Sequence, residues 1–130
     1  MPLPDNSQEA IICNAILEHV ENPIKAAAEL YRVLQKGGLC FMYVPFLYYY
    51  HAEKGYYGDY WRFTDDGIHS ICKPFASIEL APVRGPVEAL VRLSPLGRVS
   101  FLCDIGFLFD KMFGKLSSKQ VGGYYVFLRK

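Results

Sequence analysis

The side chains best suited to catalysis are concentrated in the segment 47–64, LYYYHAEKGYYGDYWRFT. Its histidine, His51, has an unperturbed pKa near neutrality, so it could take a proton from a hydroxyl or amine acceptor. Asp59 and Arg62 could orient the same acceptor. A structural explanation competes with this one: His51 packs among tyrosines, and Asp59 forms a local ion pair with Arg62, whose guanidinium stacks on an aromatic ring. The segment therefore gives a hypothetical catalytic set, His51, Asp59 and Arg62.

Aromatic residues fill the same segment. Aromatic rings with polar tips suit small organic ligands, but the same residue types are enriched at protein interfaces, and the sequence does not separate the two uses. If the segment lines an acceptor pocket, we expect the substrate to contact Tyr56, Tyr57, Tyr60 and Trp61.

The elements around this segment indicate why it lies at a binding edge. The run 38–46, GLCFMYVPF, is apolar almost throughout, which is typical of a strand covered on both faces of a parallel sheet. The apolar run 10–16 predicts a second such strand. A helix over 24–36 joins them, so the order strand, helix, strand predicts a βαβ unit with a right-handed crossover. The segment 47–64 then leaves the carboxyl end of a strand, where open α/β sheets bind ligands.

Local signals define that helix and the elements that follow it. Asn22 and Pro23 suit its first turn, Ile24 begins its expected apolar face, and Gly37 and Gly38 suit its end. Further along the chain we expect a helix over 65–72 and strands over 76–83 and 124–128. The apolar stretch 86–114 predicts two helices broken at Ser94–Pro95.

The chain is long enough for one domain, 1–130. We assign 1–85 and 120–130 to the sheet core and 86–119 to an apolar helical insertion. The mixed charges of that insertion favour core or dimer contacts over a membrane surface, and no run is apolar enough to span a membrane.

Composition narrows the function classes. The net charge of +1 gives no electrostatic case for nucleic acid or an anionic membrane. The four cysteines are far apart and show no CxxC spacing, so we expect no metal site and no disulfide framework. Buried free thiols and the absence of a signal-peptide pattern favour a cytoplasmic location.

Short motifs in a fixed order point to a family. They are LPDNSQEAIICNAILEHVENP, AAAELYRVLQKGG, VPF and, later, DYWRFT. Together they resemble the second half of class I S-adenosylmethionine-dependent methyltransferases of the type 11 kind. The resemblance covers residues 3–85 and the closing strand. It implies an α/β, partial Rossmann-like fold whose mixed sheet is equivalent to strands 4-5-7-6, with the last strand antiparallel between 38–46 and 76–83.

The same resemblance implies a function. The cofactor would be S-adenosylmethionine, and the reaction would be methyl transfer to a small acceptor through an oxygen, nitrogen or carbon nucleophile. One wall of the cofactor site would be Asn14, Ala15, Leu17 and His19, although His19 also suits a strand-end histidine that bonds the backbone.

Some of the family's parts do not occur in this chain. The glycine-rich turn and the acidic residue that binds the ribose are missing, so we expect weak or no cofactor binding by the isolated chain and uncertain activity. The strand 10–16 would then be an edge, which favours a homo-oligomer or a partner carrying the first half of the fold. The alternatives are one half of a split enzyme and a non-catalytic dimerisation or interaction module.

Overall fold

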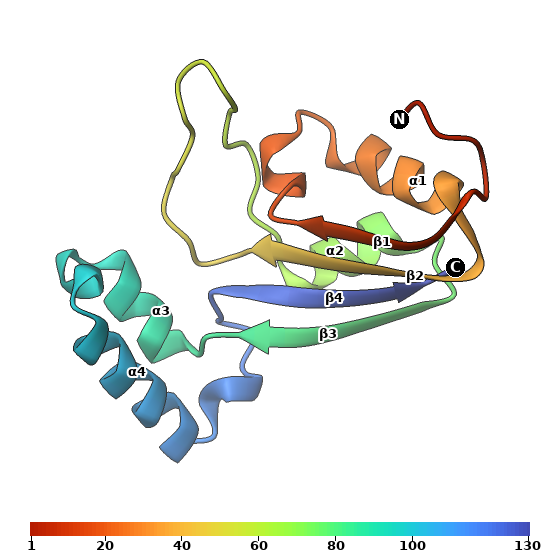
Figure 1. Ribbon diagram of the computed structural model, residues 1–130. Coiled ribbons are helices and arrows are strands. Elements are labelled where there is room, and N and C mark those ends of the chain that lie inside the picture. Colours follow the sequence, from red (N-terminus) through yellow and green to blue (C-terminus); the bar gives the residue numbers. More distant parts are fainter.

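The computed structural model describes residues 1–130 and contains a four-stranded mixed sheet with the order β1-β2-β4-β3 (Figure 1). Its first part is the expected βαβ unit: β1 (Gln8–Asn14), α1 (Pro23–Val33) and β2 (Leu34–Pro45). β1 pairs with β2 in parallel. The Asn22 side chain caps α1 by accepting a hydrogen bond from the Lys25 amide at 2.9 Å. The local signals thus determine where this helix begins.

Two boundaries in this unit differ from the sequence-based prediction. α1 ends at Val33 rather than near residue 36, and β2 begins at Leu34 rather than at residue 38. Leu34 is wholly buried and already extended, so packing of its side chain ends the helix before the glycines. β1 spans Gln8–Asn14 and is not buried on both faces, because it lies at the edge of the sheet and its Ile12 is 79% exposed.

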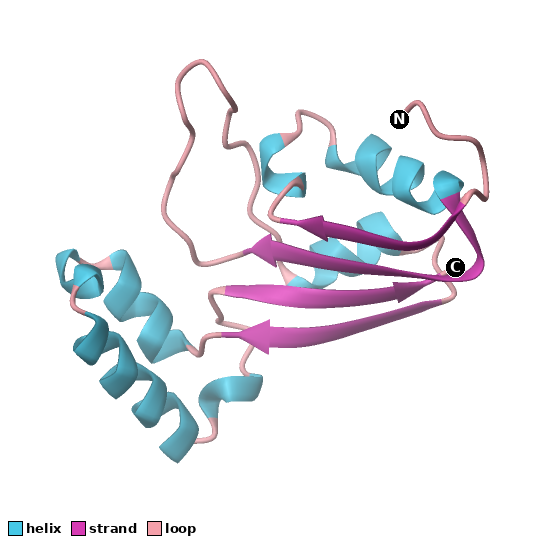
Figure 2. Cartoon of the chain, viewed as in Figure 1, coloured by secondary structure: helices cyan, strands magenta, loops and turns pink.

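Two antiparallel pairings complete the sheet. β4 (Gly123–Arg129) lies between β2 and β3 (Ser77–Val83), with Val126 opposite both Met42 and Leu80. This is the strand order and direction expected for a sheet equivalent to strands 4-5-7-6. The carboxyl ends of β1, β2 and β3 therefore meet at one edge, which is the edge from which the long loop after β2 projects (Figure 2).

The core lies between one face of the sheet and two helices. α1 and α2 (Asp65–Cys72) contact each other, and α2 is capped by the Thr64 hydroxyl, which accepts from the Gly67 amide at 3.1 Å. Ile68 and Cys72 of α2 are buried against Met42 and Val126 of the sheet. The opposite face carries clustered aromatic rings that are only partly covered, including Phe127.

A helical hairpin projects from the end of β3. It comprises α3 (Pro86–Leu93), a short turn of helix (Pro95–Arg98), α4 (Ser100–Met112) and a second short turn (Lys115–Ser117) (Figure 1). The buried carboxylate of Asp110 accepts hydrogen bonds from the Val87 and Glu88 amides, at 3.0 and 2.9 Å, and so fixes α4 to the start of α3. None of the helices is long and apolar enough to cross a membrane.

Candidate functional site

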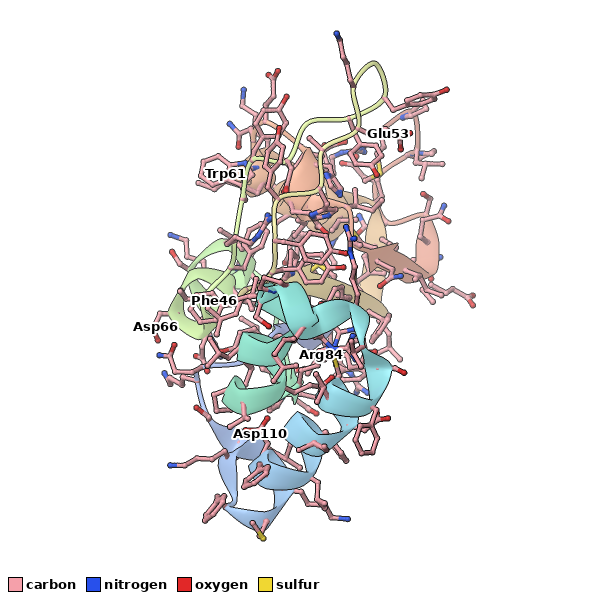
Figure 3. All side chains as sticks on the ribbon, turned by 90° about the vertical axis from the view of Figure 1, so that its left-hand side faces the viewer. Phe46, Glu53, Trp61, Asp66, Arg84 and Asp110 are labelled. Carbon is pink, nitrogen blue, oxygen red and sulfur yellow. The ribbon has the colours of Figure 1, made fainter.

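A cavity of about 700 Å³ opens at the carboxyl edge of the sheet. It lies between the turn that follows β1, the loop that follows β2 and the residues that follow β3. Its polar and aromatic lining residues are Asn14, Glu18, His19, Tyr43, Tyr48, His51, Tyr57, Arg84 and Tyr125. Figure 3 looks onto this edge, with Arg84 near the centre and with Glu53 and Trp61 on the loop beyond it.

A sharp backbone turn after β1 forms the first wall. Ala15 lies in the left-handed region, with φ of 53°, and its amide donates to the Tyr43 carbonyl at 3.1 Å. An L-residue adopts this conformation at a cost of about 1 kcal/mol or more, so the surrounding contacts must hold it. The turn directs the chain into a short helix (Leu17–His19). Leu17 consequently points into the core, whereas Glu18 and His19 line the cavity.

Glu18 is the most unusual group in the cavity. Its side chain is 1% exposed, and its Oε2 atom has no hydrogen-bond partner. Burial raises the pKa of this carboxyl group above its ordinary value. The Glu18 backbone carbonyl accepts from the Tyr60 and Trp61 amides, at 2.8 and 3.3 Å, which ties the loop to this turn.

His19 has one ring nitrogen engaged and one free. Its Nδ1 lies 2.7 Å from the Gly58 carbonyl. A carbonyl can only accept, so Nδ1 carries a proton, and in the neutral ring Nε2 has the lone pair. Nε2 lies 3.9 Å from Glu18 Oε1. The backbone contact considered for His19 is therefore present, and the ring lines the cavity as well.

His51 is held by the ion pair that the sequence suggested. Its backbone amide donates to Asp59 Oδ2 at 2.8 Å, and its Nδ1 lies 3.1 Å both from that oxygen and from the Tyr49 carbonyl. Nδ1 of His51 is thus also the protonated nitrogen. The edge of this ring faces the His19 ring, with the centroids 4.8 Å apart.

Asp59 and Arg62 lie behind the histidine rather than in the cavity. Arg62 donates from both terminal nitrogens to the Asp59 carboxylate, at 2.6 and 2.7 Å, and this pairing holds the pKa of Asp59 well below its usual range. Arg62 also donates to the Tyr48 and Tyr49 carbonyls. The cation–π contact in the structure is Lys130 over Tyr31, so the expected stacking of Arg62 is not formed. This pair positions His51 and closes the loop.

The four aromatic residues expected to contact a substrate do not all line the cavity. Tyr57 lines the cavity, with its ring 4.5 Å from that of His19. Tyr56 is 83% exposed, and Tyr60 and Trp61 are exposed as well. The Trp61 Nε1–H donates to the Val20 carbonyl at 2.9 Å, outside the cavity.

Several cavity residues were not found by sequence reasoning. Tyr43 and Tyr125 lie inside runs that look like ordinary strands, and Arg84 follows β3 at a second left-handed turn, with φ of 59°. Glu18 sits inside the LEH motif, and its acidic side chain next to buried Leu17 was the one available signal.

The cysteines play no part in the cavity. All four are free and buried, and burial raises the pKa of Cys40 and Cys72 to about 12. Thiols with such pKa values stay protonated at neutral pH and are poor nucleophiles and ligands.

Comparison with known proteins identifies the fold. Residues 1–42 match the family model of a methyltransferase domain. No curated protein matches the chain by sequence. Among similar solved structures is a SAM-dependent methyltransferase from Thermotoga maritima, a possible histamine N-methyltransferase. Its identity is 17% and its TM-score 0.62, over 100% of this chain and 59% of that one.

Two further structures agree. A SAM-dependent methyltransferase from Archaeoglobus fulgidus is 12% identical, with a TM-score of 0.60 over 98% of this chain and 62% of that one. Phosphoethanolamine N-methyltransferase 2 from Haemonchus contortus, in complex with S-adenosylhomocysteine, is 12% identical, with a TM-score of 0.53 over 98% of this chain and 34% of that one. The chain thus spans less than two thirds of each of these structures. It has the α/β fold of part of a SAM-dependent methyltransferase, as its motifs indicated.

Proposed function

We propose that the cavity is the acceptor side of a site for methyl transfer from S-adenosylmethionine to a small molecule. The observation that carries the proposal is the position of the cavity. It opens at the carboxyl edge of the sheet, beside the turn that follows β1 within the residues matched by the methyltransferase family model, and it presents an oriented histidine.

The residues present fit one side of this cofactor. Asn14 offers a polar group on the cavity wall, His19 borders that wall, and half-exposed Ile16 offers an apolar surface for a nucleoside ring. Ala15 brings its backbone to the same wall, and Leu17 supports that wall from the core. When bound, the cofactor supplies an electrophilic methyl group on a sulfonium centre.

The chain's own residues would then bind the acceptor and remove its proton. His51 presents a free Nε2, because Asp59 and the Tyr49 carbonyl hold the proton on Nδ1. A neutral imidazole oriented in this way can act as a general base at neutral pH. Tyr57 would cover the acceptor, while Asp59 and Arg62 act through His51 as positioning residues.

The opposite wall would come from a glycine-rich, nucleoside-binding segment in the same or another polypeptide. Alignment of two reactants in a rigid pocket is worth about 7–11 kcal/mol of the barrier, and one wall cannot provide it. We therefore expect the 130-residue chain to bind the cofactor weakly and to transfer methyl groups only together with such a segment.

An NMR titration with S-adenosylhomocysteine tests this proposal. We expect weak binding that shifts the amide signals of Asn14, Ala15 and His19, and tighter binding once a polypeptide with the glycine-rich half is added. Shifts confined to other surfaces would contradict the assignment of the wall. Micromolar binding by one copy of the chain alone would contradict the need for a second wall.

A second function, protein association, is supported by the edge of the sheet. β1 pairs only with β2, so its outer edge is unpaired, and Ile12 on one of its faces is exposed. Unpaired edges of this kind can add a strand from another chain, so a homo-oligomer or a docked partner would cover it. Sedimentation equilibrium distinguishes this function, because a monomer at high concentration argues against self-association.

A further inference from the structure

We propose that the cavity binds a primary amine as its ammonium ion, and that Glu18, His19 and His51 accept the three N–H hydrogen bonds of that group. The inference rests on the proposed function, because it names the class of acceptor that would receive the methyl group. The inference follows from three properties of the cluster: the ring nitrogens that carry protons, the Glu18 carboxylate oxygen without a hydrogen-bond partner, and the distances between the acceptor atoms.

The cluster consists of acceptors. Both histidines keep their protons on Nδ1, His19 against the Gly58 carbonyl and His51 against Asp59 and the Tyr49 carbonyl. In the neutral rings each Nε2 then has a lone pair that can accept a hydrogen bond. Glu18 adds carboxylate oxygens. A ligand for this cluster must consequently bring several donors of its own, and a primary ammonium brings three on one atom.

The unmatched oxygen of Glu18 gives the second reason. A buried carboxylate is costly unless it is paired, and Oε2 has no partner within the chain. The nearby cations are already engaged elsewhere. Arg62 is bound by Asp59, and Arg84, across the cavity, lies 3.5 Å from Glu88. Neither arginine therefore forms an ion pair with Glu18.

The dimensions of the cluster admit an ammonium ion. One donor atom each from Glu18, His19 and His51 lie within 4.8 Å of one another, and Glu18 Oε1 lies 3.9 Å from His19 Nε2. A tetrahedral ammonium with hydrogen bonds of about 2.8–2.9 Å holds its acceptors about 4.6–4.7 Å apart. A zinc ion with bonds of about 2.0–2.2 Å holds its ligands about 3.4 Å apart. The 3.9 Å pair lies between these two values, so competition with zinc decides between the two ions.

The aromatic neighbours suit the same ligand. The rings of Tyr48 and Tyr57 contact the two histidines, with centroids 5.2 Å from His51 and 4.5 Å from His19. Aromatic faces attract cations and cover the carbon skeleton of an amine.

The cluster can also remove a proton from the bound ammonium ion, so that the amine can react. An ammonium nitrogen has no lone pair, so one proton must leave. It would pass to Nε2 of His51: the N–H bond breaks, its electron pair stays on the amine nitrogen, and a new N–H bond forms on the imidazole. The resulting imidazolium keeps its Nδ1–H on Asp59, whose negative charge stabilises it.

Binding can be measured without any cofactor. The 130-residue chain with 13C-labelled histidine would be titrated with 2-phenylethylamine hydrochloride, with the isosteric 2-phenylethanol and with zinc sulfate. We expect the amine to shift the ring signals of His19 and His51 but not those of His69, which lies on α2 away from the cavity. The amine should bind at least tenfold more tightly than the alcohol.

Substitutions complete the test. Glu18→Gln should weaken amine binding at least tenfold, while Glu21→Gln, an exposed matched control three residues away, should not change it. His51→Phe serves as the second variant if Glu18→Gln fails to fold, as judged by urea unfolding. Equal binding of amine and alcohol, unchanged binding in Glu18→Gln, or zinc binding that the amine cannot reverse would overturn the proposal. Cofactor binding by the wall at Asn14 would survive that outcome, since the S-adenosylhomocysteine titration tests it separately.

Discussion

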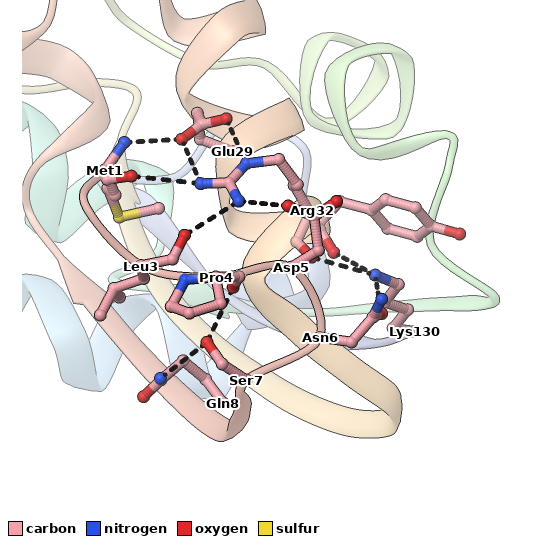
Figure 4. Close-up of polar contacts among 11 residues, drawn as sticks. Met1, Leu3, Pro4, Asp5, Asn6, Ser7, Gln8, Glu29, Arg32 and Lys130 are labelled. Atoms are coloured by element: carbon pink, nitrogen blue, oxygen red, sulfur yellow. Dashed lines mark hydrogen bonds and ion pairs between the residues drawn. The ribbon is translucent and has the colours of Figure 1, made fainter.

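At the amino end of the sheet, Arg32 donates hydrogen bonds to Glu29, to Asp5 and to the carbonyls of Met1 and Leu3 (Figure 4). At the carboxyl end, Arg62 binds Asp59 in a similar fork. In both clusters an arginine pairs with a carboxylate three residues before it. The two clusters differ in whether any hydrogen-bonding group is left without a partner.

The cationic groups of the amino-end cluster all have partners. Lys130 Nζ bonds the Asn6 side chain at 2.9 Å and the Tyr31 carbonyl at 2.6 Å, and the terminal amine bonds Glu29 at 2.6 Å. The carboxyl-end cluster, in contrast, lies at a cavity and includes a buried Glu18 oxygen without a hydrogen-bond partner. The two ends of the sheet therefore differ in what they leave for a ligand.

The largest effect should come from the packing beneath the carboxyl-end site. Leu17→Ala removes a fully buried side chain from the core, and we expect a loss of about 3 kcal/mol in the free energy of unfolding. Urea unfolding measures it. Ile16→Ala, at a half-exposed position next door, should cost less than about 1 kcal/mol. Equal costs would show that Leu17 lines the site instead of supporting it.

A smaller loss should follow from breaking the ion pair behind His51. Asp59→Asn leaves Arg62 without its partner, and we expect a loss of about 2 kcal/mol at pH 7, less than for a wholly buried pair because Arg62 keeps some solvent. The folded pKa of Asp59 is depressed, so the pair stabilises fully above the unfolded pKa of about 4, and its contribution is lost only as the pH falls through the lower folded pKa. Unfolding curves at pH 7 and pH 3 should therefore show the gap between variant and wild type narrowing. A gap that stays constant would argue against the ion pair as its cause.

Breaking the amino-end cluster should have a smaller effect on the free energy of unfolding. Arg32→Ala removes contacts that are exposed to solvent, and salt bridges of this kind contribute little to stability. We expect a smaller loss in the free energy of unfolding than for Asp59→Asn, with faster amide hydrogen exchange limited to residues 1–7. A loss as large as that of Asp59→Asn would remove the contrast between the two ends.

The smallest effect should have the opposite sign. Glu18→Gln replaces a buried carboxylate by a neutral amide, and we expect a gain of up to about 1 kcal/mol at pH 7. The folded pKa of Glu18 is raised, so ionisation destabilises the wild-type fold increasingly as the pH rises above the unfolded pKa. The gain should therefore vanish near pH 4, in urea unfolding at the two pH values. A loss at pH 7 would indicate that Glu18 is a structural residue.

Local patterns predicted most of the sheet and its helices. The cap at Asn22, the break at Ser94–Pro95 and the apolar runs gave the elements in their observed order. They failed where packing competes with local preference. Ile24, expected on the buried face of α1, is exposed, because the helix presents Ala27, Leu30 and Val33 to the core instead. A helical period defines a face only to within a residue, and the sheet decides which face is used.

The candidate site, like the fold, was predictable from the sequence only in part. The sequence by itself determined that a histidine, an aspartate and an arginine would share a loop at the carboxyl edge of a methyltransferase-like sheet, since spacing along a chain sets which residues share a loop. Only the tertiary structure decided which of them face the cavity. The left-handed turn at Ala15 and the bond from His19 to Gly58, 39 residues away, bring Glu18 beside His51. Contacts of that range arise from the closing of the loop, which no local pattern encodes.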